Sequence, residues 1–221
     1  MKIARELELR LERLVDGLSA TLFRGCMHPV DLANRLVRFI DLNVTNGKAG
    51  PEIANQYTVR MNPSEIEPSV DLVNLESELA SAVTETAVTH GWRIGGPIKI
   101  KLSLDPKVAT GGIRCTTKVA PGQLSAWCQL INSRSGIVHN IGDNRVMIGR
   151  DMDADVRIDH AKLSRWHCTL YRLEEKVWLR DVGSSNGTSI NSIRLDPQRE
   201  ARLQTGDIIS FGPATFSFRM L

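Results

Sequence analysis

The sequence predicts two domains, an α+β N-terminal domain followed by an all-β sandwich. Up to about residue 120, apolar residues recur at steps of three and four over long segments, as amphipathic helices require. Beyond that point, short apolar or alternating runs follow one another with turn residues between them, as in a sandwich. We therefore expect domains at 1–120 and 124–221, joined by a short linker at 121–123.

Three helices are expected in the N-terminal half. The apolar repeat over 3–23 predicts the first. Pro29 should open the second, because proline suits the first turn of a helix. The third should begin after Pro68, bury one face over 72–83 and stop at Gly91.

Three alternating segments of the same half predict strands, at 57–61, 98–104 and 113–119. The second and third are joined by a turn at 110–112, so we expect them to pair as a hairpin. Together with the helices, they predict a small domain with a few helices on one face of a short, mostly antiparallel sheet.

Basic residues should share the open face of that hairpin. They are Lys99, Lys101, Arg114 and Lys118. Such a stripe leaves an alternative function open, a regulator that binds nucleic acid through this face. No aromatic residues alternate with the lysines to stack bases, and antiparallel sheets often leave one face solvated. Nucleic acid is therefore the disfavoured partner.

The C-terminal half predicts strands at short intervals. The runs are 124–131, 136–141, 146–148, 166–173, 177–179, 208–211 and 214–220. Gly206-Asp207 and Gly212-Pro213 fit turns between them.

Three short signatures lie where predicted strands end or begin. They are Gly149-Arg150, Ser164-Arg165-Trp166-His167 and Ser184-Ser185-Asn186-Gly187-Thr188. Loops at one end of a sandwich would bring them together, and loops on a rigid scaffold commonly carry binding residues. A Gly-Arg or an Asn-Gly pair alone predicts only a turn, but the three signatures at this spacing predict one site.

The chemistry of these residues suits a phosphate ester on a peptide. The planar guanidinium of Arg150 can meet two phosphate oxygens with parallel hydrogen bonds, and the Ser164 hydroxyl can donate to another. Lys162 adds a flexible second charge. Asn186 offers a donor and an acceptor for peptide main chain, and Ser185 is expected to line the slot beside it.

Together, the signatures and their spacing resemble the forkhead-associated (FHA) domain, a module that binds phosphothreonine peptides. The second domain is thus expected to be an FHA-type β-sandwich. The resemblance implies a phosphopeptide site made of Arg150, Ser164, Lys162, Arg165, Ser185 and Asn186. It implies structural roles for Gly149, His167 and Gly187.

The N-terminal half resembles the domain that precedes FHA modules in actinobacterial FhaA-type proteins. The matching features are the charged first helix, the break Gly25…Pro29, Asn55-Gln56-Tyr57, Gly91-Trp92 and Thr110-Gly111. The resemblance implies a non-catalytic signalling adaptor that acts downstream of Ser/Thr protein kinases. Its partners would be threonine-phosphorylated proteins of envelope or peptidoglycan synthesis, including cytoplasmic regions of membrane proteins.

Thr110 lies in a glycine-rich turn that a kinase could reach. It is a candidate phosphoacceptor and, once phosphorylated, a ligand for an FHA domain on another molecule. The alternative is an ordinary turn threonine.

Two other interpretations of the C-terminal half are disfavoured. Ser164, His167 and Asp181 are the residue types of a hydrolase triad, but the serine lacks a nucleophile elbow. The acidic cluster Asp151, Asp153, Asp155 and Asp159 lacks the turn glycine and the closing glutamate of a calcium loop. We expect these carboxylates to orient Arg157 or to select basic residues beside the phosphothreonine. The sequence thus predicts no enzyme, no metal and no cofactor.

The cysteines and the N-terminal sequence predict a cytoplasmic protein, and composition and charge are those of a globular one. A net charge of +3 is too small to indicate nucleic acid by itself, and 42% hydrophobic residues are typical of a globular protein. The four cysteines lie far apart, which favours reduced thiols over a metal site or a disulfide framework. The sequence predicts neither a signal peptide nor a membrane-spanning segment. We expect partners to recruit the protein to the inner face of the membrane.

Overall fold

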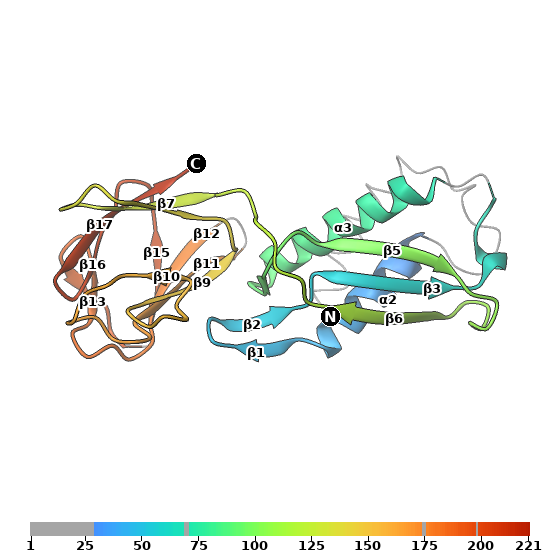
Figure 1. Ribbon diagram of the computed structural model, residues 1–221, viewed down its shortest axis with the longest axis horizontal. Coiled ribbons are helices and arrows are strands. Elements are labelled where there is room, and N and C mark those ends of the chain that lie inside the picture. The colour runs from blue at the N-terminus through green and yellow to red at the C-terminus, as the bar shows by residue number, and fades with distance from the viewer. Residues whose placement is uncertain (1–28, 69–70, 174–175, 198) are drawn as a thin grey trace. The chain divides into compact units, whose positions relative to one another are not determined.

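The computed structural model describes residues 29–68, 71–173, 176–197 and 199–221. The helix expected over 3–23 and Cys26 lie outside this range. The described residues form two compact units (Figure 1). The N-terminal unit contains 29–45, 53–87 and 94–122, and the C-terminal unit contains 46–52, 88–93 and 123–221.

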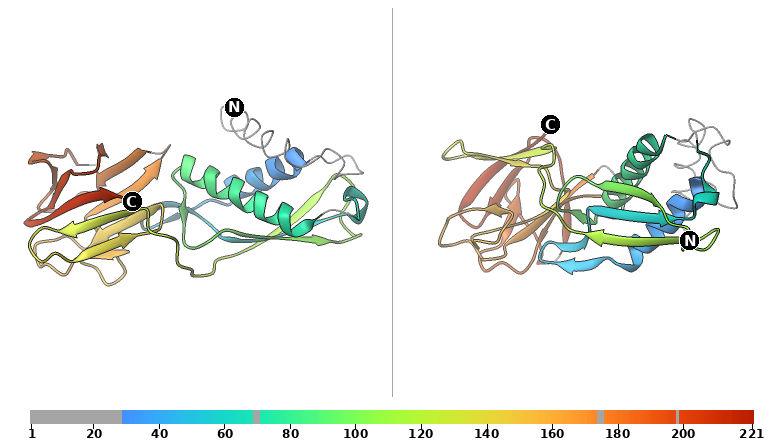
Figure 2. Two further views of the ribbon diagram at one scale, coloured as in Figure 1. Left: turned by 90° about the horizontal axis from the view of Figure 1, so that it is seen from above. Right: turned by 45° about the vertical axis from the view of Figure 1, so that its right-hand side comes forward.

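The N-terminal unit packs two helices on a three-stranded sheet (Figure 2). Helix α2 (Pro29–Leu42) buries Leu32 and Leu36 completely, and α3 (Leu72–Thr89) buries Leu75 and Leu79. Both expected helices are confirmed, because their apolar residues recur every three to four positions. Neither described helix is long and apolar enough to cross a membrane.

The sheet of this unit has the order β5-β3-β6. Its strands are β3 (Gln56–Met61), β5 (Lys99–Leu104) and β6 (Ile113–Lys118). The expected hairpin between the last two is wrong, since β3 lies between them and pairs parallel with β5 and antiparallel with β6. The long connection through α3 supplies the crossover that a parallel pair requires. Tyr57, Val59 and Met61 of β3 are almost fully buried, as the central position demands.

The basic residues nevertheless share one face of the sheet. Lys99 and Lys118 both lie opposite Gln56, and Arg114 lies opposite Arg60. Directly opposed residues point to the same face of a sheet, so Arg60 joins the basic stripe expected from the sequence.

The C-terminal unit is a β-sandwich of two sheets. The five-stranded sheet has the order β10 (Val156–Arg157), β9 (Arg145–Gly149), β11 (Cys168–Leu173), β12 (Lys176–Asp181) and β15 (Glu200–Leu203). The six-stranded sheet has the order β14 (Ile193–Arg194), β13 (Thr188–Ile190), β16 (Ile208–Phe211), β17 (Ala214–Met220), β7 (Cys128–Asn132) and β8 (Val138–Ile141).

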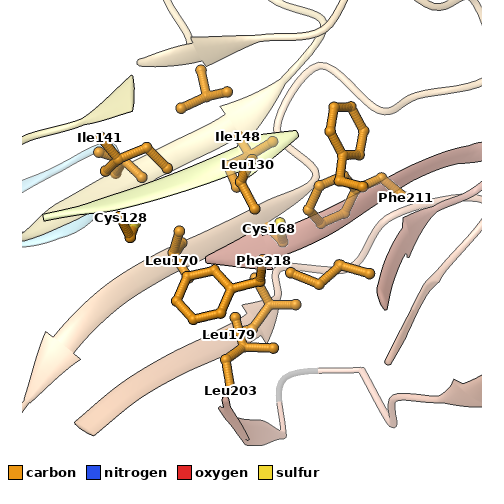
Figure 3. Packing of buried hydrophobic residues seen from close by; sticks show 14 of the residues in the cluster. Cys128, Leu130, Ile141, Ile148, Cys168, Leu170, Leu179, Leu203, Phe211 and Phe218 are labelled. Carbon is orange, nitrogen blue, oxygen red and sulfur yellow. The ribbon is translucent and has the colours of Figure 1, made fainter. Parts of the chain in front are cut away.

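Apolar side chains from both sheets fill the space between them (Figure 3). Leu130, Leu170, Leu179 and Phe211 have no exposed surface, and the Cys168 thiol is equally buried. Burial raises the pKa of this thiol well above its ordinary value. The thiol therefore behaves as a small core residue.

The sequence predicted the longer strands of the sandwich but not β10, β13, β14 and β15. Each of these has two to four residues. In β15, only Leu203 is fully buried among charged and small neighbours. So short a segment has no periodicity to detect, and its pairing partner alone makes it a strand.

Two segments from the N-terminal half belong to the C-terminal unit, at 46–52 and 88–93. They include parts of a small sheet of β1 (Thr45–Gly47), β2 (Gly50–Ile53) and β4 (Arg93–Ile94). The border between units at 122 and 123 falls within the expected linker. The extents 1–120 and 124–221 stay predictions, because no single cut in the chain separates the two units.

Arg145 of β9 connects both segments to the sandwich. Its Nε donates to the Gly91 carbonyl at 2.7 Å, and its Nη1 donates to the Ala49 carbonyl at 3.2 Å. The guanidinium lies 3.9 Å from the centroid of the Tyr171 ring. Gly50 and Gly91 both have positive φ, and both lie so close to this guanidinium that a Cβ would crowd it.

Neighbouring residues add to this attachment. Asn144, 2% exposed, donates its side-chain amide to the Trp92 carbonyl. Arg93 pairs with Asp155 and, at 3.4 Å, with Asp143. The attachment thus combines buried hydrogen bonds with partly buried ion pairs.

Replacing Arg145 by alanine should destabilise the C-terminal unit by about 2 kcal/mol, because two carbonyls lose a charged donor and the Tyr171 ring loses a cation. All four tryptophans, Trp92, Trp127, Trp166 and Trp178, belong to this unit. Denaturant unfolding followed by tryptophan fluorescence therefore reports on it alone. Arg134→Ala, in an exposed turn, is the matched control. Equal stability of the two variants would contradict the role assigned to Arg145.

Candidate functional site

The three signatures meet at one end of the sandwich. Ile148, Cys168 and Asp181 lie side by side on neighbouring strands, so the loops beyond them share an edge. These loops enclose a hollow of about 380 Å³. Its lining consists of Arg150, Ala161, Lys162, Leu163, Ser164, Arg165, Trp166, Ser185 and Asn186. All six residues expected to bind phosphopeptide therefore line one hollow, although their roles remain predictions.

Main-chain hydrogen bonds join the first two signatures. The Arg150 amide donates to the Ser164 carbonyl at 3.1 Å, and the Asp151 amide donates to the Arg165 carbonyl at 3.3 Å. Gly149 allows this approach, since a Cβ at that position would overlap the Arg165 carbonyl oxygen. Any side chain at Gly149 would push the two loops apart.

His167 links the second signature to the third. Its ring is fully buried, with Nδ1 accepting from the Ser164 amide at 3.3 Å and Nε2 3.2 Å from the Gly187 carbonyl. Because a carbonyl can only accept, Nε2 carries the proton and the ring is neutral. Burial lowers the pKa of His167, although the bond to Gly187 and the charge of Asp181 oppose the shift.

Asp181 holds the third signature in shape. Its Oδ1 accepts from the amides of Gly183 and Ser184, and its Oδ2 accepts from the hydroxyls of Ser184 and Thr188, at 2.7–2.8 Å. Burial alone raises the pKa of Asp181, but the bonds from Thr188, Ser184 and Gly183 outweigh burial and lower it. The carboxylate is only 2% exposed, so it shapes the loop without reaching the ligand.

Side chains complete the junction between loops. The Ser164 hydroxyl oxygen accepts from the Ser185 amide at 2.9 Å, and the hydroxyl donates to the Ser185 Oγ at 3.5 Å, a long contact that a ligand oxygen can replace. Asn186 donates its Nδ2 to the Lys162 carbonyl at 2.6 Å. Its Oδ1 accepts nothing from the described residues, so it remains available for peptide main chain.

The rim of the hollow is positively charged. Arg150, Lys162 and Arg165 are exposed, and no described carboxylate forms an ion pair with them. A dianion entering the hollow would meet these cations without displacing an internal partner. Fixed loops and free cations together suit a phosphate ester.

Ser164, His167 and Asp181 do not form the hydrogen-bond chain of a hydrolase triad. The His167 ring contacts the Ser164 amide rather than its hydroxyl, and Asp181 is occupied by its own loop. The sequence suggested Asp181 only as a triad member. Its bonds to residues two to seven positions later form only when the strand stops at that point.

The acidic cluster forms one expected ion pair and two unexpected ones. Asp159 lies 4.0 Å from Arg157, the pairing that the sequence suggested. Asp153 instead pairs with Lys48 at 2.7 Å, and Asp155 pairs with Arg93. These partners are 105 and 62 residues away in sequence, so no local pattern could predict them. Within the described ranges, no three His, Cys, Asp or Glu side chains are grouped as a metal site would need.

Comparisons with known proteins match both halves of the chain. The FHA domain model matches residues 146–212, and the model of the FhaA N-terminal domain matches residues 5–116. Smad nuclear-interacting protein 1 of Mus musculus is 35% identical over an alignment of 81 residues, and the match covers 31% of this chain and 21% of that protein. Protein FraH of Nostoc sp. is 37% identical over 87 residues, 38% of this chain and 30% of FraH. The chain thus spans less than a third of the length of either relative.

Among solved structures, the FHA domain of FhaA in complex with the intracellular domain of Rv3910 is 29% identical. The match covers 43% of this chain and 100% of that chain, at a TM-score of 0.38. Family membership rests on the two domain models. The FhaA N-terminal model spans more than half of the sequence, and the FHA model covers much of the sandwich that carries the hollow. The chain belongs to the FhaA family of FHA-domain proteins.

Proposed function

We propose that this protein is a non-catalytic adaptor that binds threonine-phosphorylated partners in the hollow of its FHA domain. FHA domains bind phosphothreonine peptides. The observation that supports the proposal most strongly is the rim of exposed cations, Arg150, Lys162 and Arg165, around loops fixed by buried hydrogen bonds. Donors held in place before binding need little reorganisation when the ligand arrives.

Each of the six expected binding residues has a proposed role. The Arg150 guanidinium binds two phosphate oxygens, and the Ser164 hydroxyl donates to the third. Lys162 and Arg165 add charge at the rim. Asn186 accepts from the peptide main chain, with Ser185 lining the slot beside it.

The proposed partners are phosphorylated by Ser/Thr protein kinases and act in envelope or peptidoglycan synthesis. Cytoplasmic regions of membrane proteins would recruit this cytoplasmic adaptor to the inner face of the membrane. The FHA domain of FhaA, for comparison, forms a complex with the intracellular domain of Rv3910. We propose Thr110 as a phosphoacceptor, because it is exposed in the loop between β5 and β6.

Arg150→Ala should weaken binding of a phosphothreonine peptide by about 2–5 kcal/mol, because phosphate oxygens lose a charged donor. Arg150→Lys should recover only part of the loss, since an ammonium cannot form the bidentate pair. Calorimetry measures both. The control is Arg219→Ala, an exposed arginine at the far end of β17 from the hollow. Unchanged affinity in Arg150→Ala would refute the assignment.

Asp181→Ala should lower both stability and affinity, although Asp181 is buried away from ligand. Its loss leaves buried donors unpaired and should cost about 2–4 kcal/mol of unfolding free energy. Asp181→Asn should have intermediate stability and affinity, because the hydroxyls of Ser184 and Thr188 can turn to accept from the new amide. Denaturant unfolding and peptide titration check this. A fully active, fully stable Asp181→Ala would show that other contacts shape the loop.

The free energy of unfolding of the ligand-free protein should decrease as the pH is lowered from 7.5 to 5.5. Burial lowers the pKa of both His167 and His139 in the folded protein. The unfolded chain therefore takes up protons first as the pH falls through about 6.5, which favours unfolding. Above this range both rings are neutral in either state, so the two histidines contribute no further change in stability. Equal melting temperatures at pH 7.5 and 5.5 would contradict the prediction.

A further inference from the structure

Lys48 lies beside the hollow but comes from far outside the FHA signatures. It occupies the turn between β1 and β2, in the segment 46–52 that belongs to the C-terminal unit. Its Nζ lies 5.0 Å from the centroid of the Trp166 ring and 2.7 Å from Oδ2 of Asp153. Trp166 lines the hollow together with Arg150 and Ser164. A fourth cation is therefore next to the proposed peptide site.

The turn that carries Lys48 is firmly held. The adjacent Ala49 is 2% exposed, and its carbonyl accepts from Arg145. Gly50 lies against the same guanidinium. Lys48 itself is exposed, with 54% of its side chain accessible. An exposed cationic side chain on a fixed turn suits a ligand contact at the rim of a site.

The ion pair with Asp153 is easily exchanged. Asp153 has 69% of its side chain exposed, and ion pairs this exposed are weak in water. The face of Trp166 holds the ammonium without neutralising its charge. A carboxylate of an incoming peptide can therefore take the place of Asp153 while Lys48 stays on the ring.

We propose that Lys48 is part of the peptide-binding surface and selects phosphothreonine peptides that carry acidic residues beside the phosphothreonine. This rests on the proposed function of the hollow. Asp153, which alone would favour basic neighbours, serves as the internal partner that such a peptide displaces. The alternative is that the pair only fastens the segment 46–52 to the sandwich.

The two possibilities predict opposite effects of Asp153→Asn. If the pair only fastens the turn, Lys48→Ala and Asp153→Asn both weaken it and change binding in the same direction. If Lys48 binds the ligand, Lys48→Ala weakens binding of an acidic peptide, and Asp153→Asn strengthens it by removing the competitor.

The experiment uses the full chain and three phosphothreonine peptides. One has neutral flanks, one has three glutamates before the phosphothreonine, and one has three glutamates after it. Affinities are measured by fluorescence anisotropy for the unchanged protein, Lys48→Ala and Asp153→Asn. Lys176→Ala is the matched control, an exposed lysine at the opposite end of β12 from Asp181.

For at least one acidic peptide, Lys48→Ala should lower affinity about fivefold and Asp153→Asn should raise it, with the neutral peptide changed less than about twofold. An equal loss for all three peptides in Lys48→Ala, no loss for any, or losses in both variants would overturn the proposal. Failure of the unchanged protein to bind any of the three peptides would instead refute the proposed function.

Discussion

Two buried polar side chains, Asp181 and His167, determine the shape of the candidate site. A polar group without exposure must find hydrogen-bond partners inside the protein or lose several kcal/mol. Asp181 finds them in the amides and hydroxyls of its own loop, and His167 finds them in the main chain of its own signature and of the third one. Any movement of these loops would break buried bonds, so the loops stay in place before a ligand arrives.

Because buried residues hold the loops, the exposed cations need no ion-pair partner among the described residues. The structural residues Gly149, His167 and Asp181 lie inward, where they are protected from solvent and from ligand. Arg150, Lys162 and Arg165 lie outward, on main chain that the buried residues fix. Rigidity and charge are thus supplied by different residues, and a charged rim needs no internal counterion to stay ordered.

The C-terminal unit also depends on residues outside the FHA signatures. Arg145 binds carbonyls of 46–52 and 88–93, and Asp153 and Asp155 pair with cations of the same two segments. Asp155, whose side chain is mostly buried in its pair with Arg93, therefore has a structural use that is independent of metal or peptide. The same attachment brings Lys48 to the edge of the hollow, where it becomes part of the electrostatic surroundings of any bound peptide.

By itself, the sequence determined the elements with strong periodicity and six of the nine residues that line the hollow. Helices α2 and α3 and the longer strands follow from apolar spacing, and the spacing of Arg150, Ser164 and Asn186 indicated one shared site. Apolar spacing is local information, because it assigns a residue to a face of a helix or strand, whereas the shared site was indicated by the resemblance of the three signatures to an FHA domain. Tertiary structure decided the rest. The central place of β3, the short strands, the loop network of Asp181 and the pairing of Lys48 with Asp153 each depend on partners distant in sequence or on where a strand stops, and no short stretch of sequence encodes such a partner.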